Sequence, residues 1–352
     1  LLCASVMAPE GNRTHVQAPR EERPVWVLSE DSLDEAGTDA REALQQLPGL
    51  SVRALGDSFS LATLQVRGVA SGHTRVFLDD VPLARADGAP VDLSLLPLWH
   101  SQEVRVWPAH APLGYGGGLG GALVVSSKSV GPGAYELKLQ GASFERWSAD
   151  LFAQASGEKT EAAIGLRSES SRGEFPWFDN GLTSYDSGDD KWRLRTNNDA
   201  RRDTGLLRVQ RRVGRCSAGV VAHGHDQEQG VPGPVGRLAQ RARYELTSGL
   251  GALGLRCEGS RWRASVQANL GWMRSVANDE LAEISLQPTV AEREAWSPSL
   301  RALGWWRLGD RLDVGLHQEV QRQSFTIEEK LTQGGAATSS RFGTATALAA
   351  RW

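Results

Sequence analysis

The chain lacks several features that would place it in a familiar soluble or helical membrane class. Among its 352 residues methionine occurs only twice and cysteine three times, and no run of 18 apolar residues is present, so no transmembrane helix is expected. Lys and Arg number 39 against 42 Asp and Glu, a net charge of −3 that excludes a strongly basic nucleic-acid binder. Glycine (39) and tryptophan (12) are abundant instead, which favours an all-β protein.

The three cysteines argue against a disulfide-rich scaffold, because an odd number leaves at least one unpaired. Cys216 and Cys257 admit two interpretations. They could form a disulfide in an oxidising compartment, or they could be two small apolar residues of separate strands.

Residues 1–24 are predicted to precede the folded part of the chain. Leu1–Ala8 is a short apolar run that ends in small residues, as the end of a secretory signal peptide does. Residues 9–24 are polar and rich in proline, which is typical of a flexible segment.

Residues 25–133 are predicted to form a small α+β domain. A helix is expected over Thr38–Leu47, because Ala40, Ala43, Leu44 and Leu47 share one helical face and Pro48–Gly49 follows. Turns rich in Gly, Asp and Pro separate the expected strands, which are Ser51–Leu55, Leu61–Arg67, Thr74–Asp79, Gln102–Trp107 and Ala122–Ser127.

Residues 134–352 follow a different pattern, a long series of segments in which apolar and polar residues alternate. The clearest runs from Trp262 to Trp272, with Ala, Val and Leu on one face and Arg263, Gln267 and Asn269 on the other. Ten residues at about 3.3 Å each, tilted by about 40°, span roughly 25 Å, the height of the lipid-facing band of an outer-membrane barrel with aromatic residues at both edges. A soluble β-sandwich also alternates, but its strands are shorter.

The fold class predicted is therefore an antiparallel membrane β-barrel that follows an N-terminal α+β domain. At about 20 residues per strand and loop, residues 134–352 supply about 10–12 strands. A barrel of that size has no room for the preceding domain, whereas barrels that hold an internal domain have about 22 strands. We therefore expect the barrel to be partial in this chain.

Five stretches in order between residues 41 and 128 resemble the plug domain of TonB-dependent outer-membrane receptors. The stretches are Glu42–Val52, Leu64–Gly68 with its Arg67-Gly68, Val76–Leu83 with Asp79, Asp92–Pro97, and Tyr115–Lys128 with its Tyr115-Gly116. The spacing is most similar to the cobalamin receptor branch of that family.

One stretch departs from the family pattern. Glu103 and Arg105 have exchanged places relative to the usual order, and the Arg-Gly-Pro step that normally follows is absent. The exchange puts the family's ion pairing between plug and barrel in doubt. Asp80 also replaces a usual turn glycine, and Asp tolerates a left-handed backbone better than most residues.

The resemblance implies several roles for residues of this chain. Plug loops that contact ligand would contain Gly56, Asp57, Ser58, Phe59, Arg85 and Asp87. Val25, Trp26 and Val27 form the one short extended apolar segment that could add as a strand to a TonB-type energy-coupling partner. An ordinary first strand of the domain is an equal interpretation of those three residues.

Metal and catalytic motifs are weak. Asp179, Asp186, Asp189 and Asp190 crowd one loop, where calcium could bind or where the carboxylates could simply be solvated. His223 and His225 share a strand face, but no third ligand is evident, so no metal site and no cofactor is assigned. The sequence contains no recognisable catalytic set of a nucleophile and a base, so we do not expect an enzyme.

The sequence thus predicts a receptor of the bacterial outer membrane that takes up a scarce ligand, a corrinoid or a ferric siderophore, with energy from TonB. Its partners would be that small metal chelate, the TonB-type protein and membrane lipid. The alternatives are a non-transporting sensor or binding protein, a degenerate receptor remnant, and a soluble β-sandwich enzyme. The sequence does not identify the ligand, because ligand specificity depends on loops whose structure cannot be predicted from the sequence.

Overall fold

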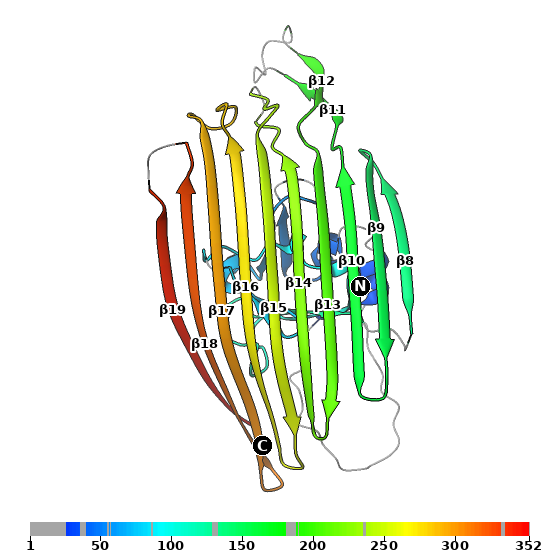
Figure 1. Cartoon of the computed structure of the whole chain (residues 1–352), viewed down its shortest axis with the longest axis vertical. Coiled ribbons are helices and arrows are strands. Elements are labelled where there is room, and N and C mark those ends of the chain that lie inside the picture. The colour runs from blue at the N-terminus through cyan, green and yellow to red at the C-terminus, as the bar shows by residue number, and fades with distance from the viewer. Residues whose placement is uncertain are drawn as a thin grey trace.

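The structure is a computed structural model that describes residues 26–35, 40–54, 56, 58–85, 87–128, 133–180, 188, 190–234, 237–331 and 335–351. Within those residues the chain forms two parts, a small mixed domain and a long curved antiparallel sheet, called the wall below (Figure 1). None of the helices in this part of the chain is long and apolar enough to cross a membrane.

The N-terminal domain is built on a five-stranded sheet in the order β1-β6-β7-β4-β5, in which only β4 and β7 run parallel. A separate hairpin, β2–β3, and short helices cover it. The sheet strands are β1 (Trp26–Ser29), β4 (Arg75–Leu78), β5 (Val81–Leu83), β6 (Ser101–Trp107) and β7 (Ala122–Ser127). The remaining elements are α1 (Glu30–Glu35), α2 (Ala40–Gln45), β2 (Leu50–Ala54), β3 (Ala62–Val66), and the 3₁₀ turns η1 (Ser71–His73), η2 (Leu93–Leu95) and η3 (Leu98–His100).

The core of this domain follows from the alternation within its strands. Val104 and Val106 of β6 and Leu123 and Val125 of β7 are fully buried against Leu44 of α2. The predicted helix and the five predicted strands are present to within two residues at each described end. The strand β1 contains Trp26 and Val27, for which an ordinary first strand was one of two interpretations. The short elements β5 and α1 were not predicted, because segments of three to six residues carry too little periodicity.

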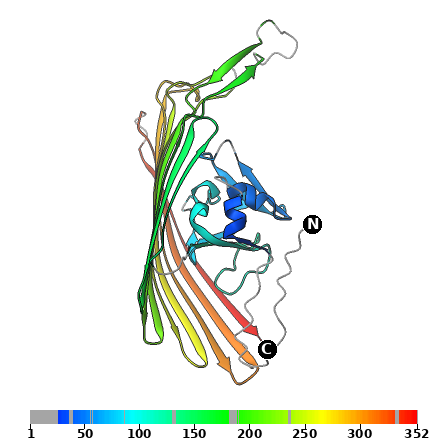
Figure 2. The ribbon, with the colours of Figure 1, turned by 90° about the vertical axis from the view of Figure 1, so that its right-hand side faces the viewer.

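The wall has ten strands, each hydrogen-bonded antiparallel to its neighbour, in the order β19-β18-β17-β16-β15-β14-β13-β10-β9-β8. The number lies within the predicted range of about 10–12. The strands are β8 (Tyr135–Ala142), β9 (Arg146–Ser156), β10 (Thr160–Ser171), β13 (Ala200–Val213), β14 (Cys216–Gly230), β15 (Arg243–Glu258), β16 (Trp262–Asp279), β17 (Thr289–Leu308), β18 (Leu312–Glu329) and β19 (Ala337–Arg351). Between β10 and β13, a hairpin of β11 (Phe175–Asp179) and β12 (Lys191–Arg195) projects beyond the sheet (Figure 2).

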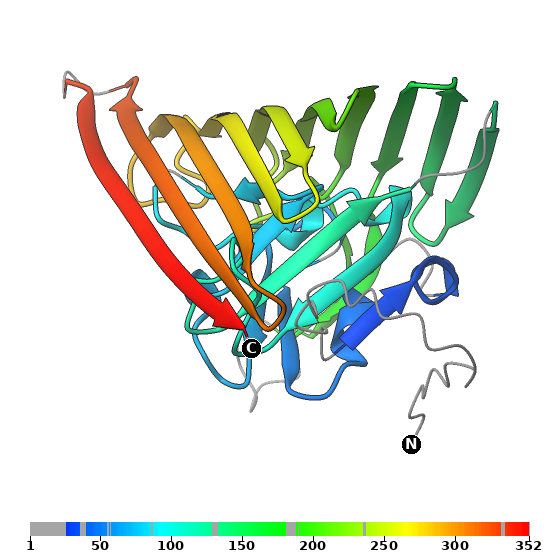
Figure 3. The ribbon, with the colours of Figure 1, turned by 90° about the horizontal axis from the view of Figure 1, so that it is seen from below.

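Burial in the wall is inverted relative to a soluble sandwich. Val266, Leu270 and Leu300 expose about half of their surface, whereas Asn269 and Arg301, which point the other way, are buried. The apolar face therefore looks outward and the polar face looks toward the N-terminal domain, which lies in the concave side of the wall (Figures 2 and 3). This arrangement matches a lipid-facing exterior and argues against a sandwich with a dry interior.

The predicted boundary between residues 133 and 134 lies between β7 and β8. Cys216 and Cys257 face each other across β14 and β15 and form a disulfide. This resolves the choice that the sequence left open, because only the strand register brings the two thiols together.

Candidate ligand site between the N-terminal domain and the wall

The two ends of the wall differ in the length of their connections. At one end the strands turn within two or three residues, at 157–159, 214–215, 259–261 and 309–311. At the other end, most connections are longer, as at 231–242 and 280–288, and the β11–β12 hairpin projects there (Figure 1). Outer-membrane barrels have short periplasmic turns and longer extracellular loops, so the long-loop end is the outer end.

Two pairs of tryptophans mark the edges of the apolar face. Trp272 of β16 pairs with Trp296 of β17, and Trp262 pairs with Trp306. The outer pair has ring centroids 6.0 Å apart. Between the pairs, the outward positions of both strands carry only Ala, Val, Leu, Pro and Gly. Aromatic residues at both edges of an apolar band are what the headgroup regions of a membrane select.

The loop before β3, which contains predicted ligand residues, contacts the wall in its outer half. Phe59 is only 3% exposed, and its ring lies between the guanidinium groups of Arg146 and Arg202, at 5.4 and 5.1 Å. The Nε2 of Gln227 donates a hydrogen bond to the Phe59 carbonyl at 2.9 Å. Phe59 therefore anchors the domain to the wall in this structure, and a ligand contact by this side chain stays a prediction.

The neighbours of Phe59 have different positions. Ser58 accepts a hydrogen bond from Arg146. Gly56 is exposed, and Asp57 lies outside the described residues. Ser58 is thus hydrogen-bonded to the wall, whereas Gly56 is open to solvent.

The second predicted loop, residues 84–91, also lies at the outer end. Arg85 and Asp87 form an ion pair at 2.6 Å, and Asp87 accepts a further hydrogen bond from the backbone N–H of Ala89 at 3.1 Å. Partial burial raises the pKa of Asp87, but the hydrogen bond and charge of Arg85 outweigh it and leave the pKa below its usual value. The loop is therefore a pre-formed charged turn.

Two cavities open beside this loop, near the level of the outer tryptophan pair. One of about 320 Å³ lies between the loop and strands β18 and β19, and its polar lining includes Arg75, Arg85, Glu319 and Arg341. The other, of about 130 Å³, lies between the loop and strands β14 to β18. Together with the loop they form the candidate ligand site, because they face the outer end and combine charge with a concave surface.

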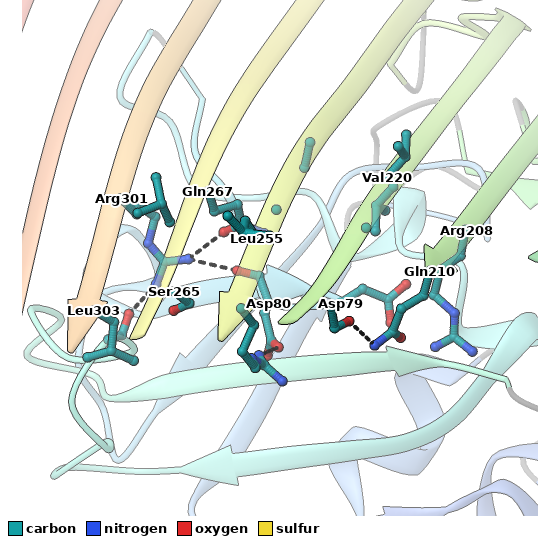
Figure 4. Close-up of a pocket in the computed structure, with 18 of the residues that line it drawn as sticks. Asp79, Asp80, Arg208, Gln210, Val220, Leu255, Ser265, Gln267, Arg301 and Leu303 are labelled. Carbon is teal, nitrogen blue, oxygen red and sulfur yellow. Dashed lines mark hydrogen bonds and ion pairs between the residues drawn. The ribbon is translucent and has the colours of Figure 1, made fainter. Parts of the chain in front are cut away.

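A third cavity, of about 350 Å³, lies nearer the short-turn end (Figure 4). Arg301 of β17 reaches across it, donating to the carbonyl of Asp80 at 2.7 Å, to Gln267 Oε1 at 3.1 Å and to the carbonyl of Gly114. This cavity is bounded by contacts that hold the domain to the wall.

The residues of the plug-like motifs form hydrogen bonds and turns within the N-terminal domain. Asp79 accepts hydrogen bonds from the backbone N–H and the hydroxyl of Ser127, at 2.8 and 2.6 Å. Tyr115 donates to Asp80, whose φ of +67° confirms the left-handed turn expected there. Arg67 and Gly68 form the turn after β3, and both have a positive φ. The carbonyl of Gly116 accepts a hydrogen bond from Arg75 at 2.9 Å.

The exchanged charges pair with each other. Glu103 and Arg105 lie two residues apart on the same face of β6, and their side chains form an ion pair at 3.1 Å. The domain is instead bridged to the wall by other pairs, Arg75 with Glu319 at 2.9 Å and Asp80 with Arg256 at 3.2 Å. Pairing between the domain and the wall is therefore present, on residues that the sequence analysis did not identify as ion-pair partners.

The wall residues missed by sequence analysis are Arg146, Arg202, Arg256, Arg301 and Glu319. Each is a charged residue at an inward position of a wall strand, and this was the available signal. The signal does not name the partner, because the contacts join residues far apart in the chain, as Phe59 and Gln227 are.

The predicted coupling segment is part of the domain's sheet. Trp26 and Val27 belong to β1, which pairs with β6, while Val25 lies outside the described residues. β1 is an edge strand, and about half of the Val27 surface is exposed.

The structure describes two of the four aspartates of the predicted cluster. Asp179 is buried and forms an ion pair with Arg193, Asp190 precedes β12, and Asp186 and Asp189 lie outside the described residues. Across the described ranges, no group of three or more His, Cys, Asp or Glu side chains is placed to hold a metal ion.

Comparison with known proteins agrees with both parts of the chain. Residues 20–122 match the family model of the TonB-dependent receptor plug domain. No curated protein sequence matches.

Solved structures share the fold at low identity. The unliganded ferric citrate transporter FecA matches with a TM-score of 0.63 at 15% identity, over 90% of this chain and 50% of that one. The copper transporter OprC matches with 0.68 at 12%, over 89% and 49%. A ferric enterobactin receptor (PfeA) mutant from Pseudomonas aeruginosa matches with 0.66 at 11%, over 91% and 57%. The chain thus spans about half the length of the structures it matches.

These structures are named as receptors and transporters, and this chain shares their fold. Residues 20–122 therefore match the plug domain of TonB-dependent receptors, and the chain as a whole shares the fold of about half of such a receptor.

Proposed function

We propose that this chain acts in the energy-coupled uptake of an anionic metal chelate across the outer membrane. The observation that carries the proposal is the outward-facing site between residues 84–91 of the plug and the wall. Its larger cavity is lined by Arg75, Arg85 and Arg341, three cations against the single carboxylate of Glu319. Guanidinium groups bind carboxylates and phenolates well, because they offer several fixed N–H donors and a permanent charge. A ferric siderophore fits this chemistry better than a corrinoid, whose surface is mostly amide.

Energy coupling would use the edge strand β1. Among the described residues, β1 pairs with β6 on one side and with no strand on the other. An extended segment of a TonB-type partner could add to that free edge through backbone hydrogen bonds. Val25, Trp26 and Val27 remain the proposed coupling segment on this ground.

Uptake of radiolabelled ferric chelates into cells that lack other receptors tests the proposal. We expect accumulation to stop when the proton-motive force is dissipated, and Arg85→Gln to reduce uptake while Arg53→Gln, an exposed arginine of β2, leaves it unchanged. Uptake of a corrinoid but of no ferric chelate would show that the ligand class is wrong.

A non-transporting binding protein is the second candidate. It is favoured by the number of contacts that hold the plug, since Arg75–Glu319, Arg301–Asp80 and Arg202–Ser94 must all part before a channel could open. Surface binding of the chelate without energy-dependent accumulation would identify this function.

A further inference from the structure

His223 and His225 form a pair of imidazoles on the inner face of the wall. Both belong to β14, where alternate side chains point to the same side, and both are more than nine-tenths buried. Their ring centroids lie 6.0 Å apart. Asp226, which follows His225 in sequence, is exposed on the opposite face, where it accepts a hydrogen bond from Thr247.

The pair lines the cavity of about 130 Å³ described above. The wall contributes His223, His225, Ser248 and Asn269 to its lining, and the plug contributes Leu83 and Arg85. Arg85 is paired with Asp87, so its charge is partly compensated.

Two buried polar atoms of the lining have no hydrogen-bond partner, His223 Nε2 and Asn269 Oδ1. The Ser248 hydroxyl lies within hydrogen-bond distance of both ring nitrogens of His225, 3.0 Å from Nδ1 and 3.2 Å from Nε2. A buried nitrogen that lacks a partner is costly, so such atoms call for a ligand or a bound water. Here the unpartnered atom belongs to one of two neighbouring imidazoles.

Two imidazoles that bind one ion through nitrogens at about 2.0–2.1 Å have ring centroids roughly 5–6 Å apart. The observed separation of 6.0 Å needs little adjustment to reach this geometry. Imidazole suits Cu²⁺, Ni²⁺ and Zn²⁺, whereas Ca²⁺ and Mg²⁺ require carboxylate or carbonyl oxygens.

We propose that His223 and His225 bind one borderline divalent transition ion directly, with Cu²⁺ the tightest of the series. The described residues supply no set of three His, Cys, Asp or Glu ligands. The remaining coordination positions are therefore filled by water or by donors of a small ligand in the cavity. This site goes beyond the proposed uptake, because a chelate keeps its metal within its own ligand.

The test is Cu²⁺ binding to the purified, detergent-folded chain, followed by calorimetry and by electron paramagnetic resonance. We expect one Cu²⁺ per chain and a spectrum with two imidazole nitrogens. We also expect His223→Gln and His225→Gln each to weaken binding by about tenfold or more. The matched control is His317→Gln, a single buried wall histidine whose Nε2 also lacks a partner and which lines a different cavity.

Three results would overturn the site. They are an affinity for Cu²⁺ that the double variant His223→Gln/His225→Gln retains, an equal loss in His317→Gln, and a spectrum with fewer than two imidazole nitrogens. If the variants fail to fold, the spectrum of the wild-type chain with ¹⁵N-labelled histidine decides the question. Because no step involves uptake, a failure here leaves the transport proposal standing, and a failure of transport leaves this site standing.

Discussion

Arg75 of the plug and Glu319 of the wall, 244 residues apart in the chain, form the central ion pair between the two parts of the molecule. The Nη2 of Arg75 donates to both carboxylate oxygens, at 3.0 and 2.9 Å, and the Glu319 side chain is 5% exposed. Arg301 lies beside the same carboxylate at 3.9 Å. Glu319 therefore joins the wall to the plug through Arg75, and it lies beside Arg301, a wall residue that itself donates hydrogen bonds to plug carbonyls.

Replacing Glu319 by Gln should loosen the plug. Breaking a buried pair leaves a charge uncompensated, at a cost of about 3–5 kcal/mol, and the partial exposure of Arg75 lowers that figure. We expect the plug to become sensitive to protease at lower urea concentration while the wall stays folded. The control is Glu328→Gln, which removes an exposed pair with Lys330. Equal protease sensitivity of both variants would contradict the assignment.

Phe59→Ala should release the loop that holds the plug to the outer half of the wall. The change removes a buried ring and two cation–π contacts, and truncation of a buried Phe costs about 3–5 kcal/mol. Hydrogen exchange of residues 58–60 should accelerate. Phe342→Ala, on an exposed ring of β19, should leave that exchange unchanged. Slow exchange in the Phe59 variant would mean that the arginines alone hold the loop.

Arg85→Gln should lower chelate affinity without altering the fold, because the side chain lines the outward cavities and its main partner is its own neighbour Asp87. The lowered pKa of Asp87 keeps the pair ionised above the usual carboxylate range, and the pair is lost only as pH falls through that lowered pKa. Chelate binding at pH 5 should therefore equal that at pH 7. An affinity that falls between those values would show that another group controls binding.

His100 should make the stability of the plug against the wall decrease in mild acid. Burial, followed by the charges of Lys128 and Arg208, lowers the pKa of His100 to about 4, and its ring packs 4.6 Å from that of Phe152 on β9. The unfolded chain takes up the proton near pH 6.5 and the folded chain only near 4, so stability falls as pH falls between those values, by at most about 3 kcal/mol.

Urea unfolding of the plug from pH 7 to pH 4 measures this loss. His100→Phe, which keeps a ring against Phe152, should abolish most of the pH dependence. A dependence that persists in this variant would point to other titrating groups.

Leu270→Arg should hinder assembly in lipid. Leu270 lies on the outward face of β16 between the two tryptophan pairs, where an arginine costs about 2–4 kcal/mol at mid-membrane depth. Gln267→Glu, on the inward face of the same strand, should cost much less, because its carboxylate meets a polar cavity and can accept the hydrogen bond that Arg301 donates to Gln267. Folding yields in lipid vesicles compare the two, and equal yields would place Leu270 outside the lipid.

Most of the fold could be predicted from the alternation of apolar and polar residues within strands and from the turn residues between them. Trp262 to Trp272 indicated a membrane strand with one apolar face, and the register adds that Trp306 and Trp296 complete both edges of the band. The buried face of α2 was correctly predicted through Ala43 and Leu44. Such local features are readable because helical and strand periods depend on neighbouring residues alone.

The candidate site was readable only in part. The sequence pointed to Arg85 and Asp87 by resemblance, and the structure places them together at the outward cavities. Nothing in the sequence indicated that Phe59 lies between Arg146 and Arg202. The predicted aspartate cluster stays a prediction where its residues lie outside the described ranges.

The sequence by itself determined the two-part organisation, the outward apolar face of the wall and the plug-like order of the first domain, because each follows from local periodicity or local motifs. Only the tertiary structure decided which partners meet. Arg75 reaches Glu319, Cys216 reaches Cys257 and the imidazoles of His223 and His225 enter one cavity with Asn269. These contacts depend on the register of strands and on the position of the plug against the wall, which no local pattern encodes.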